Sequence, residues 1–331
     1  MNDTFDRARS LAEFGTLGFG GANLGNLFTA ISDEDAMELL YAAWDAGIRH
    51  FDTSPHYGLG LSEERLGAFL RTKPRNEFHL STKVGRLLVP NEDYAGERDP
   101  FEQFDVPATR RRVVDYSEPG VRRSVEDSLQ RLGMDRIDTL YVHDPEQHGQ
   151  QNTRGNLEAG IPAVCALREE GVVVRAGVGT GSVEAARMAA AIGGIDLFML
   201  AGRFTLLEQP AHPDLLDDCR RAGIGIVNTA PFNSGLLATA NPGRELHYEY
   251  GAVPDRQLQR AQQLAAVCAE HGVDLPTAAL QFGLQHPQVV AVMMGAGNAD
   301  QVRQNVARMS HEIPRSLWED LQDRQLIPAF R

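Results

Sequence analysis

The amino-acid sequence predicts an α/β fold, a parallel (β/α)8 or TIM barrel that forms a single domain over residues 1–331. Short apolar segments alternate with segments of helical periodicity along most of the chain. Eight of the apolar segments have the length of buried strands. Because each crossover helix has to cover the outer face of the sheet, eight such units in 331 residues favour a closed barrel. No linker composition or fixed-period repeat points to a second domain.

The expected strands are short and rich in apolar residues. In chain order they are Thr16–Phe19, His50–Asp52, Phe78–Lys83, Thr139–His143, Val172–Gly179, Leu197–Leu200, Gly225–Asn228 and Val289–Met294.

The helices between these strands carry start and end signals. Ser32 is followed three residues later by Asp35, which is the spacing of a capping box. Apolar residues from Ala36 to Ala43 then recur at helical spacing, and Gly47 supplies a left-handed C-terminal cap. Further helices are expected over residues 119–132, up to Leu167 with an end at Gly171, over 182–192, 213–222 and 255–271, from Pro276 onward, and after a cap at Asn298.

Two long segments interrupt this alternation. Gly85–Asp115 follows the third strand and Phe232–Pro254 follows the seventh. Both connect a strand to the next helix, so both are expected at the C-terminal rim, where barrel enzymes have their active sites. Loops of this length in a compact domain are usually functional or disordered.

Composition and charge argue against several classes of partner. The chain has 32 Lys and Arg against 45 Asp and Glu, a net charge of −13, which argues against binding to nucleic acid. Arg110–Arg112 is flanked by acids and is interpreted as a solvated loop. No run approaches the roughly 18 apolar residues of a membrane helix, and no signal peptide is expected. The expected partner is a small-molecule substrate, and the sequence carries no signal of oligomeric state.

The three cysteines are not spaced as metal ligands. Cys165, Cys219 and Cys268 each lie within an apolar helical pattern and far from one another. They are therefore expected to be reduced and buried, in a cytoplasmic protein that has no metal site.

Polar side chains close three consecutive expected strands. Asp52 ends the second strand and Tyr57 follows it in F-D-T-S-P-H-Y-G, Lys83 ends the third in S-T-K, and His143 ends the fourth in L-Y-V-H-D. A barrel brings consecutive strand ends to one mouth, so we expect a catalytic site there.

These residue types favour proton transfer coupled to redox chemistry. Free tyrosine has a pKa of about 10, and a neighbouring ammonium group such as Lys83 lowers that pKa by favouring phenolate. Asp52 would pair with Lys83, Tyr57 would donate or accept the proton, and His143 would orient the substrate oxygen, so Tyr57 and His143 would both bind substrate. None of these side chains carries a hydride, so a cofactor is required.

A nucleotide-binding segment is expected after the eighth strand. No P-loop and no G-x-G-x-x-G motif is present. Gly295-Ala296-Gly297-Asn298 would present backbone amides and a helix N-terminus to an anion. The alternative is a tight turn followed by an ordinary helix cap.

The four residues Asp52, Tyr57, Lys83 and His143 resemble the catalytic tetrad of the aldo-keto reductase superfamily, and the resemblance extends from about Gly15 to Arg308. It implies a nicotinamide dinucleotide bound across the barrel mouth, with Phe204 stacked on the nicotinamide, residues 230–235 along the pyrophosphate, and Gln304 and Asn305 at the adenine. The cofactor positions it implies are Gly20, Gly21, Asp52, Thr180, Phe204, Pro231, Phe232, Asn233, Gly235, Gly295, Ala296, Gly297, Gln301, Gln304 and Asn305.

Some positions depart from the pattern of that superfamily. Gly179-Thr180 stands where many members have Ser-Asn against the carboxamide, and Ala201 stands in place of a glutamine. Gln301 occupies a position where members selective for NADP often have arginine. The resemblance therefore favours NAD, while nearby Arg303 keeps NADP possible.

Several motifs, among them D-T-S-P-H-Y-G-L-G-L-S-E and L-A-G-R-F-T-L-L, are similar to those of bacterial L-fucose and D-threo-aldose 1-dehydrogenases and of pyridoxal 4-dehydrogenases. The substrates of these enzymes are cyclic hemiacetals, which lose a proton and a hydride to become lactones. A general aldehyde or ketone reductase, a nucleotide-binding regulatory subunit and a Schiff-base lyase using Lys83 remain alternatives. The long loops contain aromatic residues that would stack on a substrate or pack the loops down: Tyr94, Phe101, Phe104, Tyr248 and Tyr250.

Overall fold

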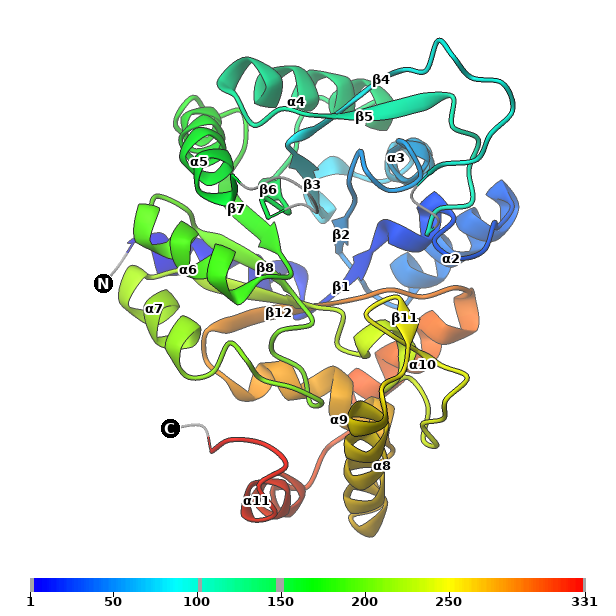
Figure 1. Ribbon diagram of the computed structural model, residues 1–331, viewed down its shortest axis with the longest axis vertical. Coiled ribbons are helices and arrows are strands. Elements are labelled where there is room, and N and C mark those ends of the chain that lie inside the picture. Colours follow the sequence, from blue (N-terminus) through cyan, green and yellow to red (C-terminus); the bar gives the residue numbers. More distant parts are fainter. Residues whose placement is uncertain (1–2, 101–102, 147–151, 330–331) are drawn as a thin grey trace.

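A computed structural model describes residues 3–100, 103–146 and 152–329 (Figure 1). Within these ranges, eight parallel strands form a closed barrel in the order β1-β12-β9-β8-β7-β6-β3-β2, which confirms the predicted fold. The strands are β1 (Leu17–Gly20), β2 (His50–Asp52), β3 (His79–Val84), β6 (Thr139–His143), β7 (Arg175–Thr180), β8 (Leu197–Ala201), β9 (Gly225–Thr229) and β12 (Val289–Met294).

The largest difference from the expected strands is the start of β7. It begins at Arg175 rather than Val172. The backbone N–H groups of Val172 and Val173 both donate to the carbonyl of Leu167, so these residues still belong to the end of the preceding helix.

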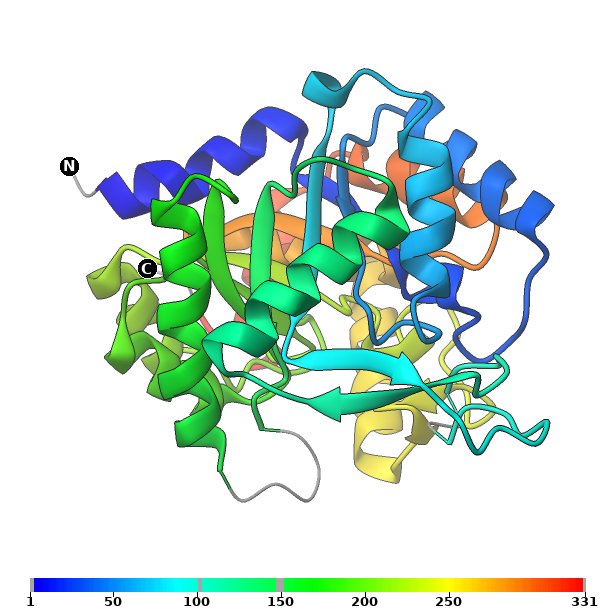
Figure 2. The ribbon, with the colours of Figure 1, turned by 90° about the horizontal axis from the view of Figure 1, so that it is seen from above.

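Helices surround the barrel, as Figure 2 shows. They are α2 (Asp33–Asp45), α3 (Leu61–Leu70), α4 (Glu118–Leu132), α5 (Thr153–Glu169), α6 (Val183–Ile192), α7 (Asp214–Ala222), α8 (Asp255–Glu270), α9 (Leu275–Phe282), α10 (Ala299–Met309) and α11 (Arg315–Asp323). The predicted capping box of Ser32 and Asp35 is present at α2, and Asn298 caps α10 through the N–H of Gln301. Neither α3 nor α11 was among the expected helices.

The N-terminal segment closes one end of the barrel. Helix α1 (Asp3–Arg9) continues into the 3-10 helix η1 (Ser10–Phe14). Figure 2 shows the N-terminal helix and the paired strands β4 (Arg86–Pro90) and β5 (Arg110–Val114) at opposite ends of the barrel. Ala8 and Leu11 are fully buried and pack with Tyr141 and Met293 from the barrel interior. The sequence did not predict this element because seven mostly polar residues show no clear apolar period.

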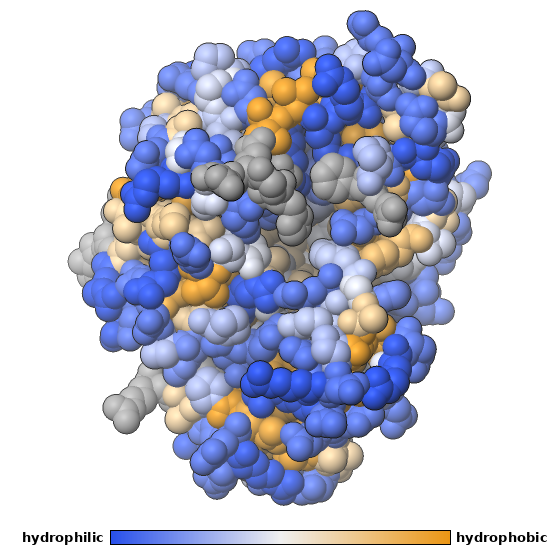
Figure 3. Space-filling model, in the orientation of Figure 1, coloured by the Kyte–Doolittle hydropathy of each residue, from blue (hydrophilic) through white to orange (hydrophobic). Residues whose placement is uncertain are grey.

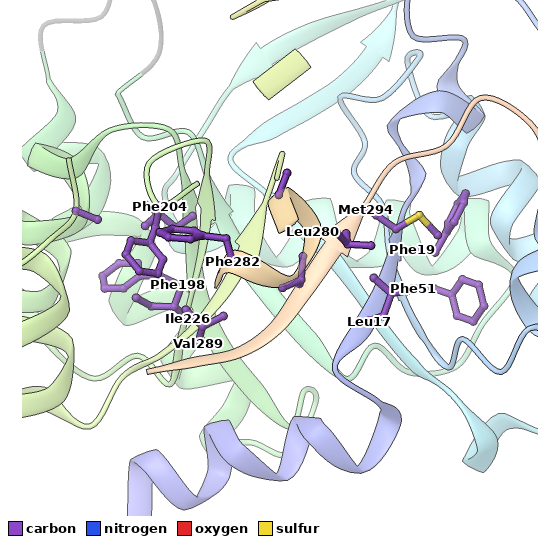
Figure 4. Packing of buried hydrophobic residues seen from close by; sticks show 14 of the residues in the cluster. Leu17, Phe19, Phe51, Phe198, Phe204, Ile226, Leu280, Phe282, Val289 and Met294 are labelled. Carbon is purple, nitrogen blue, oxygen red and sulfur yellow. The ribbon is translucent and has the colours of Figure 1, made fainter. Parts of the chain in front are cut away.

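The main core lies between the sheet and the helices. Figure 4 shows Phe198 and Ile226 from two neighbouring strands packed among the rings of Phe204 and Phe282. Burial of such rings is the main contribution to stability, because apolar area leaves water. On the face shown in Figure 3, hydrophilic residues cover most of the surface and apolar residues form separate patches.

The two long connections are partly ordered into strands. In the segment Gly85–Asp115, β4 (Arg86–Pro90) pairs antiparallel with β5 (Arg110–Val114), which corrects the expectation of a loop without strands. We call this pair the β4–β5 ribbon. Leu88 of the ribbon packs with Leu59, Phe104 and Val106, which supplies the buried face that holds the ribbon in place. In the later segment, β10 (His247–Tyr248) pairs with β11 (Gly251–Ala252).

Candidate active site

The ends of β2 and β3 bring Asp52 and Lys83 together at the barrel mouth. Lys83 Nζ donates to Asp52 Oδ2 at 2.5 Å and to the Thr53 carbonyl at 2.9 Å. The same nitrogen lies 4.7 Å from the centroid of the Tyr57 ring. Asp52 Oδ1 accepts a further hydrogen bond from Ser81 Oγ at 2.7 Å. Both carboxylate oxygens are therefore bonded, as a buried charge requires.

The Asp52–Lys83 pair is buried. Burial raises the pKa of Asp52, and the Lys83 ammonium and the hydrogen bonds from Lys83 and Ser81 oppose that rise. Burial by itself favours the neutral amine, but the Asp52 carboxylate and hydrogen bonding outweigh it, so the pKa of Lys83 is raised. Lys83 is 2% exposed and Asp52 is 3% exposed. A permanent positive charge is thus held beside the Tyr57 ring.

The phenol of Tyr57 is protonated in the free protein. Burial raises the pKa of Tyr57 above its ordinary value, the Lys83 ammonium opposes this, and Asp52 reinforces it. As predicted, the Lys83 ammonium lowers the pKa of Tyr57. Burial raises that pKa by more, so the expectation of a lowered pKa is wrong for the free protein. Tyr57 is therefore a neutral proton donor that sits beside a cation able to stabilise its phenolate.

Close backbone contact fixes the segment that carries Tyr57. Gly25 and Gly58 approach so closely that a Cβ on Gly25 would lie 2.5 Å from the carbonyl carbon of Tyr57. A Cβ on Gly58, where φ is +61°, would lie 2.4 Å from the oxygen of Gly25. Only glycines permit this contact between the loop after β1 and the loop after β2.

His143 ends β6, the strand that pairs with β3, which carries Lys83. Its ring centroid is 5.9 Å from that of Tyr57. Burial lowers the pKa of His143 well below the ordinary value, and the charges of Arg86 and Lys83 lower it further, so the ring is neutral.

The hydrogen bonds of His143 assign its tautomer. Ser54 Oγ lies 3.1 Å from His143 Nδ1 and also accepts the backbone N–H of His56 at 3.1 Å. His143 Nε2 lies 3.4 Å from Asp144 Oδ2. A neutral ring beside this carboxylate carries its proton on Nε2, so Ser54 donates its hydroxyl to Nδ1.

The β4–β5 ribbon supplies two arginines to this mouth. Arg86 donates to Asp144 Oδ2 at 2.9 Å, and Arg112 donates to both oxygens of Asp99 and to the His56 carbonyl, each at 2.7 Å. The side chain of Arg112 is 6% exposed. The interpretation of Arg110–Arg112 as a solvated loop is therefore wrong for Arg112, because Asp99 of the same connection holds it in a buried bidentate pair.

Aromatic rings line the outer part of the mouth. Phe104 lies 6.0 Å from Tyr57 between ring centroids and is buried. Phe28, which the sequence analysis did not single out, lies 5.7 Å from Tyr250, and these two rings are 44% and 54% exposed. The other three aromatic residues expected in the long loops have different surroundings. Tyr248 donates its hydroxyl to Glu208, Tyr94 is exposed, and Phe101 lies outside the described residues.

The loop after β9 contains several backbone conformations that disfavour side chains. Ala230, Asn233 and Ser234 have φ values of +54°, +47° and +58°. Such strain is concentrated at functional sites, where surrounding structure holds it. Of the expected cofactor positions here, Pro231 and Asn233 are buried, and Phe232 and Gly235 are half-buried.

Two further expected cofactor positions, Gly20 and Gly21, follow the end of β1. Gly20 is half-buried, whereas Gly21 is buried, and a Cβ there would lie 2.8 Å from the Asp52 carbonyl oxygen. The structure therefore gives Gly21 a packing role at the mouth.

Residues after β12 form the expected turn and helix start. Gly295 and Gly297 are exposed and Ala296 is buried. Gln301 accepts the N–H of Gly297 at 2.7 Å, so one backbone amide expected to meet an anion has a partner within the protein. On α10, Gln304 is exposed, whereas Asn305 is buried and donates to Met294 Sδ at 3.4 Å.

Phe204 does not line the mouth. It is 0% exposed and packs in the core against Phe282 and His286, with ring centroids 5.2 and 5.9 Å away (Figure 4). No face of this ring is open to a ligand, which contradicts the expectation that Phe204 stacks on a nicotinamide. The ring lies in the core because it packs against Phe282 of α9, which is far away in the chain.

Thr180 ends β7 and is buried. Its hydroxyl donates to Glu146 Oε1 at 2.5 Å, and the N–H of Gly181 donates to the same oxygen at 3.0 Å. Sequence reasoning missed Glu146, Asp144 and Ser54. The signal was available, because Asp144 and Glu146 directly follow His143 in H-D-P-E and Ser54 lies within D-T-S-P-H-Y.

The described residues contain no group of three or more His, Cys, Asp and Glu side chains that could hold a metal ion. In the same residues, no helix has the length and apolarity needed to cross a bilayer.

Cys219 and Cys268 are buried, whereas Cys165 is partly exposed, and all three are free thiols.

Comparison with known proteins agrees with this geometry. The model of the aldo/keto reductase family matches residues 16–324. The chain is 50% identical over 314 residues to D-threo-aldose 1-dehydrogenase from a Pseudomonas species, covering 95% of this chain and 94% of that one. It is 38% identical over 328 residues to pyridoxal 4-dehydrogenase from Microbacterium luteolum, covering 94% of each.

Two solved structures share the fold. Glycerol dehydrogenase from Gluconobacter oxydans matches with a TM-score of 0.71 at 21% identity, over 96% of this chain and 95% of that one. An aldo-keto reductase from Bacillus halodurans, in its holo form, matches with a TM-score of 0.72 at 24% identity, over 95% and 93%.

The family match covers most of the chain, and the barrel mouth holds a buried Asp52–Lys83 pair beside Tyr57 and His143. The chain therefore belongs to the aldo/keto reductase family and is an NAD(P)-dependent oxidoreductase.

Proposed function

We propose that the protein is an NAD-linked dehydrogenase that oxidises the cyclic hemiacetal of a small aldose to its lactone. The observation that carries this is the Tyr57 phenol held between the buried Lys83 ammonium and the neutral ring of His143. The 50% identity to a D-threo-aldose 1-dehydrogenase supports the substrate class.

The chemistry balances at one carbon of the substrate. The hemiacetal O–H bond breaks and its proton passes to the Tyr57 oxygen in its phenolate form, while the C–H bond of the same carbon breaks. A nicotinamide dinucleotide bound at the mouth would supply the acceptor for the hydride. The C–O bond becomes the carbonyl of a lactone. Lys83 stabilises the Tyr57 phenolate that accepts the proton, and His143 Nε2–H holds the reacting oxygen.

The choice of NAD over NADP rests on the residues at α10. Arg303 donates to Asp300 at 2.6 Å, and both side chains are largely exposed. A 2′-phosphate dianion placed there would meet the Asp300 carboxylate as well as the arginine, and like charges repel. Gln301, which is neutral, adds no compensating charge.

Pyridoxal is a second candidate substrate, because it too forms a cyclic hemiacetal. The 38% identity to a pyridoxal 4-dehydrogenase supports it. The partly exposed rings of Phe28 and Tyr250 offer faces on which a pyridine would stack. A lyase that forms a Schiff base on Lys83 is disfavoured, since Asp52 keeps that amine protonated.

The test is NADH formation at 340 nm with L-fucose, D-arabinose and pyridoxal, each offered with NAD and with NADP. We expect NADH to form with an aldose. Formation of NADPH instead would contradict the NAD assignment, and turnover of pyridoxal alone would replace the aldose by the second candidate. Tight dinucleotide binding without turnover of any aldose or aldehyde would favour a regulatory subunit. Reduction of aldehydes without oxidation of any hemiacetal would favour a general reductase.

Tyr57→Phe provides the matched control for the reaction itself. It removes only the phenol oxygen, and we expect loss of turnover with dinucleotide binding retained.

We also propose a cytoplasmic location, because the three cysteines are free thiols.

A further inference from the structure

Glu146 holds a defined position at the ends of β6 and β7. It lies three residues after His143, and its Oε1 accepts hydrogen bonds from Thr180 Oγ1 and from the N–H of Gly181. In the barrel register, His143 lies beside Gly179, the residue before Thr180. The carboxylate of Glu146 is thus tied to the strand that neighbours the catalytic histidine.

The second oxygen of this carboxylate has no partner. Glu146 Oε2 is a buried atom with no hydrogen-bond partner among the described residues. A buried acceptor left unbonded costs free energy, more so when it belongs to an ionisable group. Such an atom beside a catalytic site calls for a donor supplied by a ligand.

The backbone next to Glu146 carries two glycines at which a side chain would meet only ordinary van der Waals contacts. A Cβ on Gly179 would make only ordinary contacts, the nearest being Met199 Cβ and Tyr141 Cβ at 3.8 Å and Lys83 Cε at 3.9 Å. A Cβ on Gly181 would lie 3.8 Å from the Ala201 oxygen. By contrast, a Cβ on Gly177 would lie 2.6 Å from the Leu197 oxygen. A strand glycine that packing does not require is one signature of a place where a ligand approaches the strand closely.

Two parts of the reacting complex could reach this place. Hydride transfer requires the nicotinamide to lie against the substrate carbon, whose oxygen binds to Tyr57 and His143. A nicotinamide is planar, carries an N–H donor on its carboxamide and is positively charged when oxidised, so it matches a flat glycine surface, an unbonded acceptor and a negative charge together. A sugar hydroxyl matches only the acceptor.

We propose that Glu146 anchors the nicotinamide, with Oε2 accepting a hydrogen bond from the carboxamide NH2 and Thr180 and Gly181 holding Oε1. Glu146 is then a cofactor-binding residue. Burial raises the pKa of Glu146, and the hydrogen bonds from Thr180 and Gly181 oppose that rise. The ionised carboxylate stabilises the pyridinium of NAD+ more than the neutral ring of NADH. Glu146 therefore favours binding of the oxidised cofactor, which suits an enzyme that takes up NAD+ and releases NADH.

The experiment measures binding by titration calorimetry, without turnover. NAD+ is compared with 3-acetylpyridine adenine dinucleotide, in which a methyl group replaces the NH2. The wild-type chain is expected to bind NAD+ about tenfold more tightly, the effect of one charge-assisted hydrogen bond. In Glu146→Gln this ratio is expected to fall towards one, because a glutamine amide donates equally well to either carbonyl. Glu184→Gln, an exposed glutamate on α6, is the matched control and should keep the wild-type ratio.

A second readout is the ratio of the dissociation constants for NADH and NAD+. Glu146→Gln should weaken NAD+ more than NADH and so lower this ratio, whereas a purely structural role would weaken both equally. Thr180→Val, which keeps the carboxylate but removes its hydroxyl donor, should lower the preference for NAD+ over the analogue by a smaller factor.

The proposal is overturned by any of three results. The first is an unchanged preference for NAD+ over the analogue in Glu146→Gln. The second is an equal loss of affinity for NAD+ and for NADH in Glu146→Gln. The third is unchanged dinucleotide binding with a raised KM for the substrate, which would assign Glu146 to a sugar hydroxyl. If Glu146→Gln does not fold, as judged by thermal unfolding, Thr180→Val decides by the same ratios.

Discussion

Lys83 Nζ and Asp52 Oδ2 lie 2.5 Å apart, with side chains that are 2% and 4% exposed. This ion pair joins the ends of two neighbouring strands and places a fixed positive charge next to the Tyr57 ring. Because both partners are buried, the charge of either one depends on the other, and stability and catalysis depend on the same contact.

Lys83→Met should therefore destabilise the protein strongly, since it leaves the Asp52 carboxylate buried without its counter-charge. Removing one partner of such a pair costs about 3–5 kcal/mol of the free energy of unfolding. The double variant Asp52→Asn with Lys83→Met should recover most of that loss while remaining inactive. Urea unfolding measures both, and Arg315→Met, in an exposed pair, is the control. Equal stability of the single and double variants would contradict this account.

The pH dependence of turnover should differ between the two directions. Oxidation of a hemiacetal needs Tyr57 as phenolate, whereas reduction needs the phenol. Because the pKa of Tyr57 is raised above its ordinary value by burial, oxidation should accelerate as pH rises above neutrality, and reduction should hold constant and then fall. The measurement is kcat/KM against pH in both directions, with the protein shown to be folded at each pH. A profile for oxidation that falls with rising pH would exclude Tyr57 as the base.

Acid should destabilise the fold through its buried histidines. Burial lowers the pKa of His50 to about 3, and it lowers those of His79 and His143 well below the ordinary value. The unfolded chain then binds more protons than the folded one below about pH 6.5, so stability falls as pH decreases from there, by up to about 1.4 kcal/mol per histidine and pH unit.

Urea unfolding at pH 7.5 and pH 5.5 measures this loss. His50→Phe should reduce the difference between the two pH values, because one proton uptake is removed. His311→Gln, at an exposed position, should leave the difference unchanged. A difference that survives His50→Phe undiminished would point to other groups.

Ser54→Ala should slow catalysis without affecting dinucleotide binding. The Ser54 hydroxyl bonds to His143 Nδ1, and its loss frees the ring to take the other tautomer. We expect kcat to fall by about tenfold, as for one hydrogen bond of about 1.4 kcal/mol. Nitrogen chemical shifts of His143 report the tautomer directly, and Ser54→Thr, which keeps a hydroxyl, should restore both. Slower turnover with an unchanged Nε2–H tautomer would refute the positioning role.

Gly25→Ala should displace Tyr57, because the new Cβ would lie 2.5 Å from the carbonyl carbon of Tyr57. Overpacking of this kind costs about 1–3 kcal/mol of stability. The movement should also reduce kcat more than it reduces dinucleotide affinity, since the loop carries the proton donor. Full activity in a folded Gly25→Ala variant would show that the contact does not position Tyr57.

The sequence by itself was sufficient for the barrel and for the prediction that Asp52, Tyr57, Lys83 and His143 meet at its mouth. Strand and helix periods, the capping box at Ser32 and the cap at Asn298 are local patterns, and local patterns determine local backbone structure. Asp52, Lys83 and His143 could be placed together because each ends a strand, and barrel closure makes neighbouring strand ends adjacent.

Only the tertiary structure decided the protonation and surroundings of those residues. Burial is set by the segments that the fold packs together: it keeps Tyr57 protonated against Lys83 and encloses Phe204 in the core beside Phe282. The fold of the connection after β3 likewise pairs Arg112 with Asp99. No local pattern carries this information. Whether a polar group is solvated, paired or left without a partner, as at Glu146 Oε2, depends on which distant residues the fold brings around it.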